Sequence, residues 1–151
     1  MIQFFHVYKS YQEDLPILMD VNFKVDRGEF VCITGPSGAG KSTLLKMVFC
    51  AEQPNEGQIL VDQTNVSRLR GSQVSLLRRS VGVVFQDFKL IPSLTVYENV
   101  AVTLRILGFP PSRTQHRVGI MLKLVGLEKR AGARPSRLSG GEQQRVAIAR
   151  A

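Results

Sequence analysis

Residues 35–42, Gly-Pro-Ser-Gly-Ala-Gly-Lys-Ser, have the types and spacing of a phosphate-binding loop of the form GxxxxGK[ST]. Glycines in such a loop let successive backbone N–H groups turn toward phosphate oxygens, and the helix that follows adds the positive end of its dipole. Lys41 would reach the outer phosphates, and the Ser42 hydroxyl is a ligand type suited to Mg²⁺. A plain glycine turn between a strand and a helix would explain Gly35 and Gly40, but not Lys41 and Ser42 in register.

A second candidate anion site lies near the C-terminus. Ser139 and Glu142 have the S-x-x-E spacing of a capping box, which predicts the start of a helix over residues 142–149. Gly140 and Gly141 would leave backbone N–H groups uncovered by side chains. On spacing alone an ordinary capped helix is the favoured interpretation. The whole string Leu-Ser-Gly-Gly-Glu-Gln-Gln-Arg over residues 138–145, however, is more specific than a capping box.

This string resembles the signature motif of ABC-type ATPases, and residues 35–42 resemble the Walker A motif of that family. Gln86 falls where the family has its Q-loop glutamine, and Tyr11 falls where it has the aromatic residue that stacks on adenine. The resemblance covers essentially all 151 residues, with motif order and spacing both matching. A Walker A motif and this signature together in one chain are highly specific.

The resemblance implies ATP and Mg²⁺ as ligands and assigns residues to them. Ser42 and Gln86 would contact the metal, and the signature residues would meet ATP bound to a second subunit. The nucleotide-binding residues implied are Tyr11, Gly35, Pro36, Ser37, Gly38, Ala39, Gly40, Lys41, Ser42, Thr43 and Gln86. The signature residues are Leu138, Ser139, Gly140, Gly141, Glu142 and Gln143.

Three further strings, at residues 2–11, 85–92 and 95–101, are similar to the cell-division branch of the family. The branches that serve lipoprotein release and macrolide export share most of them. The resemblance implies a head-to-tail homodimer, a membrane subunit as partner, and a cytoplasmic location, peripheral on the inner face of the plasma membrane. The apolar residues Phe88, Leu90, Ile91 and Leu94 would either receive a helix of that partner or belong to the core.

The sequence departs from the family's pattern at its end. The chain stops at Ala151, before the point where the family has its Walker B strand, catalytic glutamate and switch histidine. We therefore expect no catalytic residue in these 151 residues, and a non-catalytic nucleotide-binding module stays open as an alternative to an active ATPase. The strand predicted at residues 30–33, which leads into the loop of residues 35–42, should also have an unpaired apolar edge.

The elements that must position these residues are predicted from periodicity. Alternating or continuous apolar residues predict strands at 2–7, 19–25, 30–33, 58–61 and 81–85, and helical periodicity predicts helices at 43–49, 75–79, 96–107, 113–125 and 142–149. The predicted fold is α/β: a P-loop NTPase of the ABC nucleotide-binding type, with a mixed sheet and incomplete at the C-terminus. Residues 1–151 would form one ABC-type ATP-binding domain, with a helical subdomain at about 88–145.

Composition narrows the function classes. Hydrophobic residues make up 44% and charged residues 21% of the chain, which excludes a disordered protein. No apolar run approaches the ~18 residues of a membrane span. The net charge of +8 comes from residues 101–151, and no aromatic residue follows Phe109 there, so we expect no nucleic-acid partner. Cys32 and Cys50 are expected to be reduced and buried.

Overall fold

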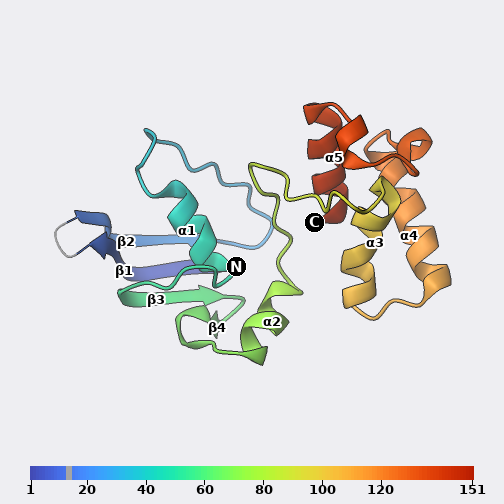
Figure 1. Cartoon of the computed structure of the whole chain (residues 1–151). Helices are drawn as coiled ribbons and strands as arrows, with labels where there is room; N and C mark the ends of the chain where they lie inside the picture. The colour runs from blue at the N-terminus through green and yellow to red at the C-terminus, as the bar shows by residue number, and fades with distance from the viewer. Residues whose placement is uncertain (13–14) are drawn as a thin grey trace. The chain divides into compact units, whose positions relative to one another are not determined.

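The computed structural model describes residues 1–12 and 15–151, which divide into two compact units at residues 1–80 and 81–151 (Figure 1). The first unit holds a sheet and short helices. The second is helical. Each unit has its own core of buried apolar side chains.

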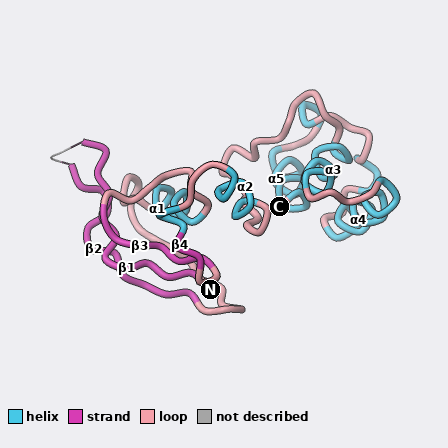
Figure 2. Tube along the Cα trace, turned by 90° about the horizontal axis from the view of Figure 1, so that it is seen from below, coloured by secondary structure: helices cyan, strands magenta, loops and turns pink. Residues whose placement is uncertain are grey.

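The sheet of the first unit has four antiparallel strands in the order β2-β1-β3-β4 (Figure 2). Its strands are β1 (Ile2–Gln12), β2 (Leu15–Val25), β3 (Glu56–Val61) and β4 (Thr64–Asn65). Phe4 on the central strand β1 faces Phe23 on one side and Ile59 on the other. The Phe4 and Phe23 rings stack at 4.5 Å, and Phe4 and Ile59 are fully buried. The strand predicted at residues 2–7 is therefore confirmed, but its alternation is interrupted, because Phe4 and Val7 are both buried.

Three helical segments join this sheet: α1 (Lys41–Val48), η1 (Val66–Arg68) and α2 (Ser72–Arg78). Figures 1 and 2 show α1 lying over one face of the sheet. Its Leu44, Met47 and Val48 are buried at the spacing of one helix face, which packs the helix onto the strands. This packing fixes the start of α1, and therefore the loop before it.

A bulge in the β1–β2 pair changes which side chains face the core. The register shifts between Phe4 and Val7, where His6 has a left-handed φ of 46°, and again between Val7 and Lys9, opposite Asp20 with its φ of 47°. Strict alternation along residues 19–25 predicts Met19 inward, but Met19 is 68% exposed and Leu18 is buried instead. The extra residue of the bulge shifts the alternation by one position, which sequence periodicity does not reveal.

The two continuous apolar runs predicted as buried strands, residues 30–33 and 81–85, are not strands in the described chain. Phe30 is 97% exposed, and Cys32 is exposed rather than buried. A strand needs a neighbour to close its ladder of hydrogen bonds, and β1 to β4 pair only among themselves. Residues 30–33 expose apolar side chains, but the expected bare strand edge is wrong because no strand forms there. The described sheet is also antiparallel rather than mixed.

The second unit is built from α3 (Val96–Ile106), α4 (Pro111–Leu124) and α5 (Gly140–Arg150), with short turns η2 (Glu128–Arg130) and η3 (Pro135–Arg137) between the last two. The three helices match the predicted ones to within three residues at each end. They enclose one core of buried apolar side chains: Val96, Val100, Ala101, Val118, Leu122, Leu127, Leu138 and Val146. Among the residues that the structure describes, no helix is long and apolar enough to cross a membrane.

Candidate functional site

The glycine-rich loop of residues 35–40 leads directly into α1, and Gly40 is the residue at which the loop becomes helix. Gly40 has a φ of 84°, in the left-handed region that glycine tolerates without strain. A Cβ atom there would lie 2.7 Å from Leu18 Cδ2 and 2.9 Å from Ile17 Cγ2. The position therefore requires glycine for two reasons, backbone conformation and close packing on β2.

The start of α1 carries no side-chain cap. The first N–H groups of a helix have no partner within the helix, so a cap, water or a ligand must satisfy them. A helix N-terminus also carries the positive end of the helix dipole. The first turn of α1 contains no acidic residue that would neutralise it. This helix start has the properties of an anion-binding position.

Lys41 adds a cation at the same place. Its Nζ donates hydrogen bonds to the carbonyl oxygens of Gly35, at 2.8 Å, and Pro36, at 2.7 Å. These bonds hold the ammonium group against the loop. Among residues 1–12 and 15–151, no carboxylate forms an ion pair with Lys41. Its positive charge is thus not neutralised by a side chain of the described chain, and it can pair with a phosphate.

Tyr11 lies beside the same helix. Tyr11 Oη and Thr43 Oγ1 are 3.4 Å apart, within hydrogen-bond distance, which joins the end of β1 to the first turn of α1. The Tyr11 side chain is half exposed, at 53%, and Lys9 Nζ lies 5.0 Å from its ring centroid. An exposed aromatic ring next to a phosphate-binding loop is suited to stack on a nucleotide base. Ser42 is exposed at the start of the helix.

The signature residues form the start of α5 in the second unit. Ser139 and Glu142 make the predicted capping box: Glu142 N donates to Ser139 Oγ at 3.2 Å, and Ser139 N donates to Glu142 Oε2 at 2.8 Å. Gln143 Nε2 donates to the carbonyl of the buried Leu138 at 3.2 Å. The box is confirmed as a structural feature, with the helix beginning at Gly140, two residues earlier than predicted.

Glu142 is held ionised by its surroundings. Its pKa lies below the ordinary value of 4.5, chiefly because the backbone and hydroxyl of Ser139 donate to the carboxylate, with Arg130 adding a favourable charge at 3.3 Å. Gly140 and Gly141 are exposed beside it, and a Cβ atom at Gly140 would meet no heavy atom within 4 Å. The two hydrogen bonds of the capping box use the N–H groups of Ser139 and Glu142, and not those of Gly140 and Gly141.

Gln86 lies in the second unit, in a turn that follows the coil at residues 81–85. The neighbouring Asp87 pairs with Lys89 at 2.6 Å, and that bond lowers the pKa of the Asp87 carboxyl. Gln86 is exposed and belongs to a different unit from the loop of residues 35–42. Its predicted contacts with nucleotide and metal stay predictions.

Two residues that sequence reasoning missed hold the segment after Gln86. Asn99, fully buried in α3, accepts a hydrogen bond from Ile91 N at 2.8 Å and donates to the carbonyls of Ile91, Leu94 and Thr95. Arg150 donates to the carbonyls of Phe88, at 2.8 Å, and Lys89, at 2.6 Å. Asn99 is a polar residue on the apolar face of α3, and this pattern in the sequence could have indicated that its side chain is buried and hydrogen-bonded.

The apolar residues that follow Gln86 lie in two different environments. Leu90 packs against the helical core, whereas Ile91 is 38% exposed. The packing of Leu90 agrees with the core interpretation, and the partner-binding interpretation stays a prediction.

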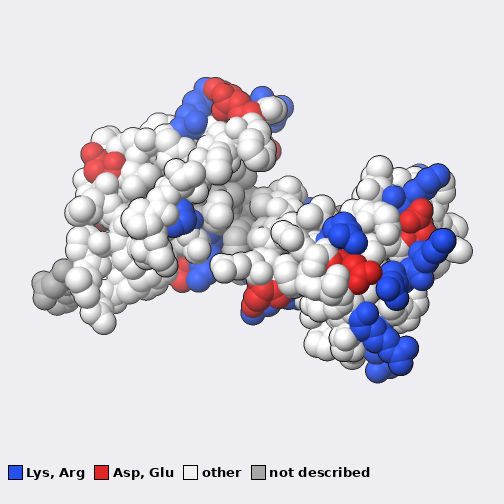
Figure 3. Space-filling model, turned by 90° about the horizontal axis from the view of Figure 1, so that it is seen from above, with Lys and Arg blue, Asp and Glu red and all other residues white. Residues whose placement is uncertain are grey.

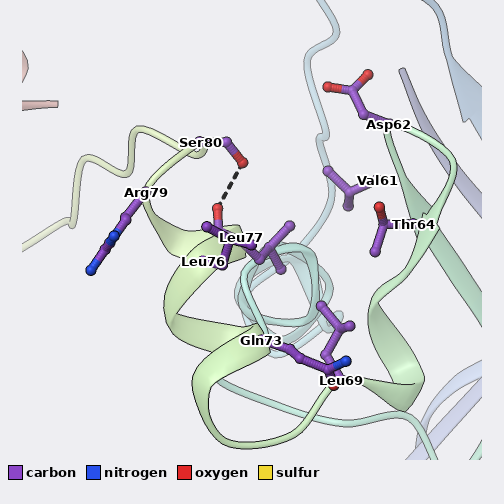
Figure 4. A pocket seen from close by; sticks show the side chains of 9 residues that line it. All are labelled: Val61, Asp62, Thr64, Leu69, Gln73, Leu76, Leu77, Arg79 and Ser80. Carbon is purple, nitrogen blue, oxygen red and sulfur yellow. Dashed lines mark hydrogen bonds between the residues drawn. The ribbon is translucent and has the colours of Figure 1, made fainter. Parts of the chain in front are cut away.

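A pocket of about 500 Å³ lies elsewhere in the first unit, between α2 and the β3–β4 hairpin (Figure 4). Its wall is mainly apolar, with Leu69, Leu76 and Leu77 contributing side chains, and Ser80 Oγ donates to the Leu77 carbonyl at 2.8 Å. None of the residues predicted to bind nucleotide lines it. The pocket is therefore separate from the loop of residues 35–42.

The family model described as ABC transporter matches residues 18–151. The chain belongs to this family. It is 47% identical over 150 residues to the cell division ATP-binding protein FtsE of Bacillus subtilis, covering 99% of this chain and 66% of the relative. It is 46% identical over 151 residues to FtsE of Escherichia coli K12, covering 100% of this chain and 68% of the relative. It is also 45% identical over 145 residues to the methionine import ATP-binding protein MetN of Symbiobacterium thermophilum, covering 96% of this chain and 44% of that one.

A solved structure agrees with this family. A dimeric ATP-binding cassette in a post-hydrolysis state, bound to ADP and Pi, has a TM-score of 0.91 and 40% identity, covering 99% of this chain and 68% of that one. The predicted fold class is confirmed by this similarity. The chain spans about two thirds of the length of the FtsE relatives, so it is part of an ABC ATPase domain.

Proposed function

We propose that the chain is the ATP-binding part of an FtsE-like subunit, which uses ATP with Mg²⁺ to drive a membrane partner in bacterial cell division. The observation that carries the proposal is the start of α1. There an uncapped helix N-terminus, a left-handed Gly40 with no room for a Cβ atom, and an unneutralised Lys41 meet in one loop. The 46–47% identity to two FtsE proteins supports the cell-division branch.

The residues of the first unit fit the ligand that the family implies. The loop residues 35–43 would hold the phosphates, with Lys41 on the outer ones and the Ser42 hydroxyl on Mg²⁺. Tyr11 would stack on adenine. The magnesium ion would supply charge neutralisation at the phosphates, while Lys41 and the loop amides bind and orient them. Gln86 would be a further nucleotide and metal contact, and the residues 138–143 would meet ATP on the second subunit of a homodimer.

The proposed partner is an FtsX-like membrane subunit, with the chain peripheral on the cytoplasmic face of the plasma membrane and no nucleic acid bound. Residues 1–151 would then be one ATP-binding domain, with residues 88–145 as its helical subdomain. The 45% identity to a MetN protein favours an import ATPase as the second candidate. Co-purification of the protein with an FtsX-like subunit supports the first candidate, and co-purification with an importer subunit supports the second.

We further propose that these 151 residues bind nucleotide without turning it over. Hydrolysis needs an oriented water and stabilisation of charge on the transferred phosphoryl group. After Glu142 the given sequence has no acidic residue that could orient this water. Phosphate release above that of a Lys41→Ala variant, at saturating ATP and Mg²⁺, would contradict this part of the proposal.

Binding of ATP to the purified chain, measured by calorimetry for wild type and for Lys41→Ala, tests the nucleotide assignment. Loss of charge-assisted bonds to phosphate should weaken affinity about tenfold to a hundredfold. The matched control is Lys46→Ala, which removes the same charge from an exposed position in the last turn of α1. Equal affinities for the wild type and Lys41→Ala, or equal losses in the two variants, would remove the loop from the proposed site.

A further inference from the structure

One side of α4 combines exposed cations with exposed aliphatic side chains. Arg113, Arg117, Ile120 and Leu124 follow one another at spacings of four, three and four residues. At 100° per residue they lie within about 60° of one another around the helix. We call these four residues the outer stripe. Because α4 runs over Pro111–Leu124, the stripe extends along most of the helix.

The outer stripe takes no part in the core of the helical unit. The helix buries Thr114, Val118 and Leu122 on its other side. In contrast, Ile120 is 44% and Leu124 75% exposed, and both arginines are exposed. Two large aliphatic side chains in solvent, following two arginines on the same side of the helix, are not required for folding of the described unit.

The sequence segment that carries the stripe has charged residues of one sign. Between Glu98 and Glu128 the sequence contains no acidic residue but four cations: Arg105, Arg113, Arg117 and Lys123. On the face of the helical unit turned to the viewer, Figure 3 shows more blue side chains than red. Arg113 lies near the start of α4, where the helix dipole favours acidic residues, so helix stability does not account for it.

Phe109 contacts the stripe, and two further exposed aliphatic residues precede it in the sequence. The Arg117 guanidinium lies 4.5 Å from the ring centroid of Phe109, and Thr114 Oγ1 donates to the Phe109 carbonyl at 3.3 Å. Stacking on an aromatic ring orients the guanidinium plane without neutralising its charge. Just before this loop, Ile106 is 61% and Leu107 40% exposed at the end of α3.

We propose that the outer stripe binds the surface of an anionic phospholipid bilayer, with α4 lying in the plane of the interface. Arginines pair well with phosphate oxygens, and aliphatic side chains on the same side enter the boundary between headgroups and acyl chains. The stripe has no aromatic residue on which a nucleic-acid base would stack. This contact goes beyond the proposed function, since it needs neither nucleotide nor a membrane subunit.

Sedimentation of the full chain with vesicles, without nucleotide, tests the proposal. The chain should bind vesicles of equal parts phosphatidylglycerol and phosphatidylcholine, bind pure phosphatidylcholine weakly, and lose affinity as salt rises. Each cation near such a surface contributes roughly fivefold, so Arg113→Glu with Arg117→Glu should lower the partition coefficient more than tenfold. The matched control, Arg68→Glu with Arg79→Glu, makes the same change in net charge at exposed positions of the first unit and should keep most of the binding.

A second variant tests the aliphatic half. Ile120→Ser with Leu124→Ser should lower binding about tenfold while leaving the circular dichroism spectrum unchanged, because both side chains are exposed. Equal binding to neutral and anionic vesicles, equal losses in the stripe and control charge variants, or unchanged binding of the serine variant would overturn the proposal. So would tighter binding of the same stripe to an RNA duplex than to anionic vesicles.

Discussion

Two helices of this chain begin at glycine-rich segments, and they differ in how their starts are capped. At α5, Ser139 and Glu142 close a capping box on each other's backbone N–H groups. At α1, Gly40 supplies no side chain, and the cation Lys41 stands where α5 has polar and acidic caps. Side chains therefore satisfy two N–H groups at the start of α5, those of Ser139 and Glu142, whereas no side chain caps the start of α1.

The two helix starts therefore have different roles: the start of α5 contributes to stability, and the start of α1 is available for ligand binding. A box such as that of α5, which α3 repeats with Thr95 and Glu98, stabilises a helix without any ligand. The start of α1 gives up that stabilisation and keeps a positive end of the helix dipole beside an unneutralised ammonium group. We therefore expect substitutions at α1 to act on packing and ligand affinity, and substitutions at α5 to act on the helix itself.

The largest effect on stability is expected at Gly40. Gly40→Ala forces a Cβ into the left-handed region and within 2.7 Å of Leu18, which should lower the free energy of unfolding by about 3 kcal/mol. Gly140→Ala, at the start of α5, has open space and should cost close to nothing. Urea denaturation of both variants measures the difference, and equal losses would show that the two glycines have the same role.

A smaller effect is expected at the cap of α5. Ser139→Ala removes the acceptor for Glu142 N and should lower the free energy of unfolding of the helical unit by about 1 kcal/mol. Ser136→Ala, an exposed serine three residues earlier, is the control and should be neutral. If the two variants unfold alike, the box contributes no stability and the contrast with α1 fails.

The smallest effect is a dependence on pH, which the glutamate of a capping box should confer and the start of α1, with no acidic residue, should not. The pKa of Glu142 is lowered in the folded chain, so its contribution is present above its ordinary value of 4.5 and is lost as pH falls through the lower folded value. The wild type should therefore exceed Glu142→Gln in stability near neutral pH, with the gap closing in acid. A gap that is constant with pH would contradict the ionised cap.

Much of this arrangement could be predicted because it depends on local sequence. The capping box over Ser139 and Glu142 and the loop before α1 follow from residue type and spacing alone. The runs at residues 30–33 and 81–85 could not be placed, because a buried strand exists only beside a partner strand, and an apolar run carries no information on its partners. The prediction that Met19 faces inward was wrong for a related reason: the bulge at Asp20 depends on how β2 pairs with β1.

The most direct test of the central claim is an amide NMR titration of the chain, diluted to a monomer, with ATP and Mg²⁺. The account predicts that the amide signals of Gly38, Gly40, Lys41 and Thr43 shift, because the start of α1 is the open anion site. The amides of Gly140 and Gly141 should not shift in the monomer, because their role requires ATP on a second subunit. Shifts at Gly140 and Gly141 with none at residues 35–43 would contradict the account.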